Sequence, residues 1–134
     1  MLKRTIAFIF FLSIITISSV QAQSQEAQSK KEVLVLSSYF QGYAWAENLA
    51  SAVVSRYAVN RRLTVEVEFL DLVAQRDSVL MREKAESIMN TNDATGKEIV
   101  ILIGEEAWIM YRTFMKGAWK EVPCVAVFSG EYTF

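Results

Sequence analysis

The stretch Ile99-Val100-Ile101-Leu102-Ile103-Gly104 decides the fold class of this chain of 134 residues. Five apolar residues in a row, most of them β-branched, are typical of a strand that is covered on both faces of a sheet. Gly104 ends this strand, and an apolar helical stripe follows from Ala107 to Met115. A covered strand that leads directly into a helix predicts a parallel sheet with crossover helices.

The segments on either side repeat this alternation of strand and helix. Apolar runs at 33–36 and 124–128 predict two further strands, and the alternating run 63–70 predicts a half-exposed strand near the sheet edge. Helices are predicted over 43–59, over 79–89 with Asp77 or Ser78 as the cap, and from Gly104 to Gly117. The order β-α-β-α-β-α-β predicts an α/β fold, a parallel sheet with helices on both faces.

The first 22 residues predict export from the cytoplasm. Lys3 and Arg4 precede an apolar run from Ile6 to Ile17, and Val20-Gln21-Ala22 fits the small-x-small pattern of a signal-peptidase site. This run of about a dozen residues is shorter than the roughly twenty of a spanning helix, which favours a cleaved signal peptide over a membrane anchor. We therefore expect a periplasmic chain with a polar, flexible leader over 23–31 and a globular part over 32–134.

Composition removes whole classes of function. The chain has no histidine and one cysteine, Cys124, so it contains no Ser-His-Asp triad, no Cys-His pair, no histidine-ligated zinc and no internal disulfide. Cys124 lies in an apolar run and is expected to be a buried small hydrophobe. Without Lys3 and Arg4, the 14 basic residues fall to 12 against 15 acidic ones, which argues against a nucleic-acid partner. We predict no catalytic residue, no cofactor and no metal site.

Polar and aromatic residues follow the first predicted strand, at the edge where open parallel sheets bind their ligands. The loop 37–42 offers two hydroxyls, and it leads into the unpaired N–H groups of a helix start, which suit an anion. Its aromatic rings suit planar or apolar groups. The candidate contacts here are Ser37, Ser38, Tyr39, Tyr43 and Trp45, although Trp45 also fits the apolar stripe of the following helix.

Three further loops reach the same predicted edge and contribute Asp71, Gly104, Glu105, Glu106 and Ser129. Asp71 can accept a hydrogen bond from a ligand or cap the next turn. The two glutamates can meet a cationic ligand group, or they can complement the dipole of the helix that they begin. An acid/base pair between Asp71 and one of these glutamates would instead indicate a secreted enzyme, but no substrate motif accompanies it.

Four motifs in order resemble those of periplasmic substrate-binding proteins of the ABC-transporter type, and still more those of extracytoplasmic sensor domains built on that fold. Val33–Tyr39 with Gly42-Tyr43 and Trp45 is similar to the opening of these domains, and Phe69-Leu70-Asp71 to the end of their second strand. Gly104–Ala107 resembles their short acidic turn, and 122–134 resembles Val-Pro-Val-Val-Phe-x-Gly-x-x-x-Phe. The resemblance covers 32–134, the whole predicted globular part.

This resemblance implies a two-lobed binding fold in which the chain forms the first lobe. A second lobe and a membrane signalling module, often a histidine kinase of a two-component system, would follow Phe134. The predicted order agrees, because it supplies no helix to cover the strand at 124–128. The expected function is binding of a small-molecule ligand as the input of signal transduction, and a solute-binding protein of an ABC transporter is the alternative.

Overall fold

The structure is a computed structural model that describes residues 30–128. The predicted signal peptide, all of the leader but its last two residues, and Ser129 lie outside the described residues. The elements follow in the order β1 (Lys31–Ser37), α2 (Ala44–Ala58), β2 (Leu63–Phe69), α3 (Ser78–Thr91), the short 3-10 helix η1 (Ala94–Gly96), β3 (Lys97–Ile103), α4 (Glu105–Met110), the π-helical turn η2 (Tyr111–Met115) and β4 (Cys124–Val127).

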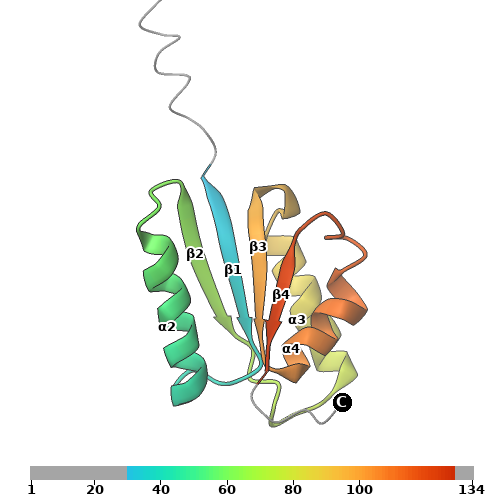
Figure 1. Cartoon of the computed structure of the whole chain (residues 1–134). Coiled ribbons are helices and arrows are strands. Elements are labelled where there is room, and N and C mark those ends of the chain that lie inside the picture. The colour runs from blue at the N-terminus through green and yellow to red at the C-terminus, as the bar shows by residue number, and fades with distance from the viewer. Residues whose placement is uncertain (1–29, 129–134) are drawn as a thin grey trace, which may run out of the picture.

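The sheet has four parallel strands in the order β2-β1-β3-β4, and all its carboxyl ends meet at the lower end of Figure 1. This confirms the predicted α/β fold with a parallel sheet. β3 lies between β1 and β4, as its unbroken apolar run predicts, and β2 lies at an edge, as its alternating sequence predicts. Since β2 and β3 lie on opposite sides of β1, the order switches direction between β1 and β3.

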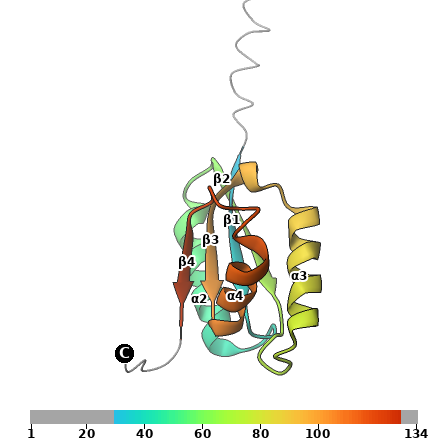
Figure 2. The ribbon, with the colours of Figure 1, turned by 90° about the vertical axis from the view of Figure 1, so that its right-hand side faces the viewer.

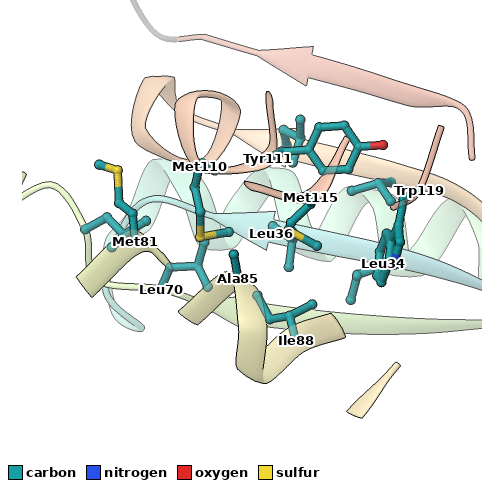
Figure 3. Packing of buried hydrophobic residues seen from close by; sticks show 14 of the residues in the cluster. Leu34, Leu36, Leu70, Met81, Ala85, Ile88, Met110, Tyr111, Met115 and Trp119 are labelled. Carbon is teal, nitrogen blue, oxygen red and sulfur yellow. The ribbon is translucent and has the colours of Figure 1, made fainter. Parts of the chain in front are cut away.

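Side chains of successive residues in each strand point to opposite faces of the sheet, and helices cover both faces. The larger core has fifteen buried residues, which include Leu34 and Leu36 of β1 and residues of α3, α4 and η2. Figure 3 shows most of them. Six buried residues, among them Val33 and Val35, form a smaller core with α2 on the other face. Figure 2 shows α2 on one side of the sheet and α3 and α4 on the other. The layer that contains α3 and α4 therefore holds most of the buried apolar surface.

The helix after Gly104 differs from its prediction, because it does not stay α-helical up to Gly117. α4 gives way to the π-helical turn η2, in which the N–H of Lys116 donates to the carbonyl of Tyr111 at 2.9 Å. A π turn places residues five apart on one face, so that both Met110 and Met115 lie in the larger core (Figure 3). The wider turn thus adapts the helix to the shape of its core.

The remaining boundaries differ from the predicted ones by only a few residues. Lys31, expected in the leader, is the first residue of β1, and its N–H donates to the carbonyl of Arg62 at 3.1 Å. Of the two predicted caps, Asp77 caps α3 by accepting a hydrogen bond from the N–H of Val79 at 2.8 Å. Cys124 is half-buried against the larger core. None of the helices within 30–128 combines the length and the hydropathy that crossing a bilayer requires.

Candidate functional site

The loops after β1, β2 and β3 are joined at the carboxyl edge of the sheet by backbone hydrogen bonds. The N–H of Ser38 donates to the carbonyl of Ile103 at 2.8 Å, and the N–H of Leu72 donates to the carbonyl of Ser38 at 2.7 Å. The N–H of Asp71 reaches the carbonyl of Tyr39 at 3.3 Å. Candidates from three predicted loops therefore come together beside the switch point between β1 and β3. They are Ser37, Ser38, Tyr39, Tyr43, Trp45, Asp71, Gly104, Glu105 and Glu106.

The hydroxyls of Ser37 and Ser38 form hydrogen bonds within the protein. Ser38 is fully buried, and its Oγ accepts a hydrogen bond from the N–H of Ala107 at 2.8 Å. This bond satisfies one of the N–H groups that the start of α4 leaves without a helical partner. Ser37 is equally buried, and its Oγ accepts from the N–H of Tyr39 at 3.3 Å. In this conformation neither hydroxyl is exposed to a ligand, and both hold the edge together.

Gly104 allows β3 to end close against the first loop. Its φ of +97° lies in a region that L side chains rarely adopt. A Cβ at this position would also lie 2.6 Å from Ser38 Oγ and 3.0 Å from Tyr39 Cε2. The N–H of Gly104 donates to the carbonyl of Val127 at 2.8 Å and so joins the end of β4 to the same edge. Gly104 is therefore a packing requirement of the candidate site.

The aromatic residues of the first loop form one cluster, which we call the aromatic shelf (Tyr39, Phe40, Tyr43 and Trp45). The rings of Tyr39 and Tyr43 stack with their centroids 4.5 Å apart and their planes 8° apart. Trp45 meets Tyr39 edge-on at 5.6 Å and packs against the smaller core, as its place in the helical stripe predicts. Phe40 is 52% exposed and Tyr43 is 40% exposed. The shelf thus presents apolar ring surface at the strand tips.

Asp71 lies directly after β2, where it turns the chain sharply. Its φ is +51°, in the left-handed region, which aspartate tolerates better than most residues. The side chain is exposed. Both expectations for this residue, a ligand contact and a turn residue, are compatible with this geometry.

Glu105 and Glu106 share a cation that was not among the predicted site residues. A terminal nitrogen of Arg76 lies 2.9 Å from Glu106 Oε1 and 4.0 Å from Glu105 Oε2. The Glu106 side chain is only 5% exposed, and a carboxylate at that depth needs a partner. The sequence does hold a signal for Arg76 as a site residue, because Arg76 is the only basic residue in the three segments that follow β1, β2 and β3, which are 37–43, 70–77 and 104–106. The ion pair connects the loop after β2 with the start of α4.

A second polar cluster lies at the opposite, amino end of the sheet. Lys97, the first residue of β3, is buried, and its ammonium donates to Glu32 and to Asn92, with Glu66 at 3.9 Å. Burial alone would raise the pKa of Glu32, but hydrogen bonds with Glu66 and Lys97 and the lysine charge together lower it. The hydrogen bond with Glu32, and then burial, raise the pKa of Glu66. This cluster joins β1, β2 and β3.

In the part of the chain that the structure describes, the carboxyl edge has no recognisable metal-binding cluster. Within residues 30–128, no three aspartate, glutamate, cysteine or histidine side chains gather in a way that would hold a metal ion. Comparison of the chain with protein-family models, with curated proteins and with solved structures gives no match. The fold and the geometry of the carboxyl edge are therefore the features that bear on what this chain binds.

Proposed function

We propose that this chain is an extracytoplasmic domain that binds a small molecule, and that the carboxyl edge of its sheet is the ligand surface. The aromatic shelf beside the switch point between β1 and β3 is the observation that carries this proposal. Open parallel sheets bind their ligands at such a point, because loops that leave in opposite directions open a crevice there.

The residues around the shelf indicate the chemistry of the ligand. Exposed rings of Phe40 and Tyr43 suit a planar or apolar body. The Arg76 side chain is 69% exposed and its guanidinium is oriented by Glu106, so that it can donate hydrogen bonds to an acceptor on the ligand. The exposed carboxylate of Asp71 can accept from a hydroxyl or an amine. We therefore expect a small molecule that combines an apolar part with hydrogen-bonding groups.

The wider role that we propose is the input of a membrane histidine kinase. In this role the chain forms one half of a cleft and a second lobe forms the other half. Ligand binding closes the cleft about a hinge and so biases a downstream signalling element. The resemblance of the motifs at 33–45, 69–71, 104–107 and 122–134 to sensor domains supports this role, and the features of residues 1–22 support export.

The test is a screen of amino acids, sugars and small carboxylic acids against the ¹⁵N-labelled chain. Amide chemical shifts are the appropriate measurement, because they detect the millimolar binding that an open surface gives. We expect at least one compound to shift the amides of 38–43, 71–76 and 104–107 together. If the compounds shift only amides at the amino end of the sheet, or none at all, the edge is not the ligand surface.

Two substitutions then examine the shelf with the compound that binds. Tyr43→Leu removes an exposed stacked ring and is expected to weaken binding by roughly tenfold. Tyr57→Leu is the matched control, because it makes the same change in the last turns of α2, far along the chain from the shelf. Equal losses of affinity in the two variants would mean that the shelf does not contact the ligand.

A further inference from the structure

A second surface lies along β2, beside the strand tips but distinct from them. β2 is the terminal strand of the sheet, so that within 30–128 only its β1 side is paired. This leaves the outer edge of a seven-residue strand, Leu63–Phe69, available for hydrogen bonding. Such an edge is a template for an additional extended segment.

A groove of about 540 Å³ runs between this strand and α2. β2 contributes Val67 and Phe69 to it, and α2 contributes an exposed apolar side chain, Val54, which is 40% exposed. The other residues of α2 that line the groove are mostly small, and this gives the groove its width. They are Glu47, Ala50, Ser51 and Ser55. The groove can therefore take small apolar side chains that project from a strand placed along β2.

The opposite face of β2 is acidic. Glu66 and Glu68 lie two residues apart and so project from the same face of the strand. The nearest cation to Glu66 is Lys97 at 3.9 Å, but Glu32 and Asn92 accept the hydrogen bonds of that ammonium. No ion pair formed within the described range involves Glu68. One ammonium thus serves the carboxylates of both Glu32 and Glu66, and Glu68 has none, so that carboxylates outnumber cations beside the open strand edge.

We propose that the β2 edge binds an extended, basic segment of a partner protein. Side chains of a strand alternate between its faces, so a segment along β2 places one set in the groove and the other beside Glu66 and Glu68. The first set would be small and apolar, and the second set lysine or arginine, because opposite charges on neighbouring strands stabilise pairing. This proposal does not depend on the ligand site.

A second copy of this chain fits the same edge poorly. Antiparallel pairing of two β2 strands would set Glu66 and Glu68 of one copy beside the same carboxylates of the other. Like charges on neighbouring strands destabilise pairing, and charged residues on an edge strand are a common protection against self-association. The acidic face therefore selects a partner of opposite charge.

The test uses the full chain and three nine-residue peptides. The first alternates lysine and valine, the second has the same composition in blocks, and the third alternates glutamate and valine. We expect only the first to shift amides of both β2 and α2 (63–69 and 50–55) and to slow hydrogen exchange of β2 amides. Equal binding of the block peptide, or shifts confined to other elements, would overturn the proposal, because pairing along β2 requires the two-residue period.

Charge reversal provides the second measurement. The double variant Thr64→Lys with Glu68→Lys adds positive charge to this face and leaves Glu66 beside Lys97, and it is expected to bind the lysine peptide at least tenfold more weakly and to prefer the glutamate peptide. Glu83→Lys with Ser87→Lys makes the same charge change on the exposed surface of α3 and should leave the preference unchanged. If both double variants lose the lysine peptide equally, overall charge explains the binding and the β2 edge is not the site.

Discussion

Gly104 is the residue whose replacement should damage the carboxyl edge most directly. Gly104→Ala is expected to cost at least about 2 kcal/mol of unfolding free energy, because the residue has positive φ and its Cβ would meet Ser38 Oγ at 2.6 Å. Gly117→Ala is the matched control, since nothing lies within 4 Å of a Cβ there. Urea unfolding of both variants gives the comparison, and a loss at position 117 as large as that at 104 would contradict the argument.

Tyr111 should make the stability of the chain sensitive to alkaline pH. Burial, together with the neighbouring Cys124, raises the pKa of Tyr111 from 10.0 to about 12. Because the folded pKa lies above the unfolded one, the resulting stabilisation is complete below pH 10 and is lost as the pH rises through 12.

The corresponding measurement is urea unfolding at pH 9 and pH 11. The original chain is expected to lose about 1 kcal/mol more than Tyr111→Phe between these two values, because phenylalanine has no proton to release. An equal loss in both proteins would mean that other groups cause the alkaline destabilisation.

At the level of single residues, the sequence predicted positions better than roles. It placed Ser38 and Gly104 at the carboxyl edge because both follow apolar strands. It did not indicate that Ser38 Oγ accepts a hydrogen bond from the N–H of Ala107, since that bond joins residues far apart in the chain. Arg76 was missed for the same reason, because its carboxylate partner Glu106 belongs to a different loop.

Between elements, the ion pair of Arg76 and Glu106 should couple the loop after β2 to α4. Arg76→Gln leaves a carboxylate that is 5% exposed without its cation, and we expect a cost of roughly 1 kcal/mol, since water can partly replace an exposed guanidinium. In the double variant with Glu106→Gln, the combined cost should be smaller than the sum of the two single costs.

The control for this cycle is the exposed pair of Lys120 and Glu121, 4.0 Å apart. Lys120→Gln should leave the urea midpoint almost unchanged, because exposed ion pairs contribute little to stability. Strict additivity of the Arg76 and Glu106 substitutions would show that the two elements are not coupled through this pair.

Element type was predictable here, and element detail was not. The period of the apolar residues indicated the strands and helices, and one of the two candidate caps of α3, Asp77, is the cap in the structure. The π-helical turn after Met110 has no such signal, because it arises from the fit of Tyr111 and Met115 into one core. Tertiary packing decides a feature of this kind, and a local pattern cannot show it.

Across the whole molecule, the two layers should differ in local stability. α2 buries only Ala46 and Ala50, whereas α3 buries Met81, Ala85 and Ile88 against the larger core. Since local opening is easiest where little apolar surface is buried, amides of α2 should exchange with solvent at least tenfold faster than those of α3. Hydrogen exchange followed by NMR measures this ratio, and equal protection in both helices would show that they open together.

The parallel sheet could be predicted from the alternation of strands and helices, but its strand order could not. The unbroken apolar run of β3 predicts a strand covered on both faces, and the alternating sequence of β2 predicts a half-exposed strand. These patterns are enough to place β3 inside the sheet and β2 at an edge. Whether β3 pairs with β1 or with β2 depends on long-range packing. That pairing creates the switch point, and so the location of the candidate site became definite only with the structure.

The direction of β1 has a practical consequence for attaching the protein to a sensor chip. This strand enters the sheet at Lys31 and ends beside the aromatic shelf, about 20 Å away for seven residues. A biotin or a tether attached on the N-terminal side of Lys31 therefore lies at the amino end of the sheet, opposite the strand tips (Figure 1). Molecules captured by that end point their aromatic rings toward the flowing solution, and this orientation suits a direct binding assay.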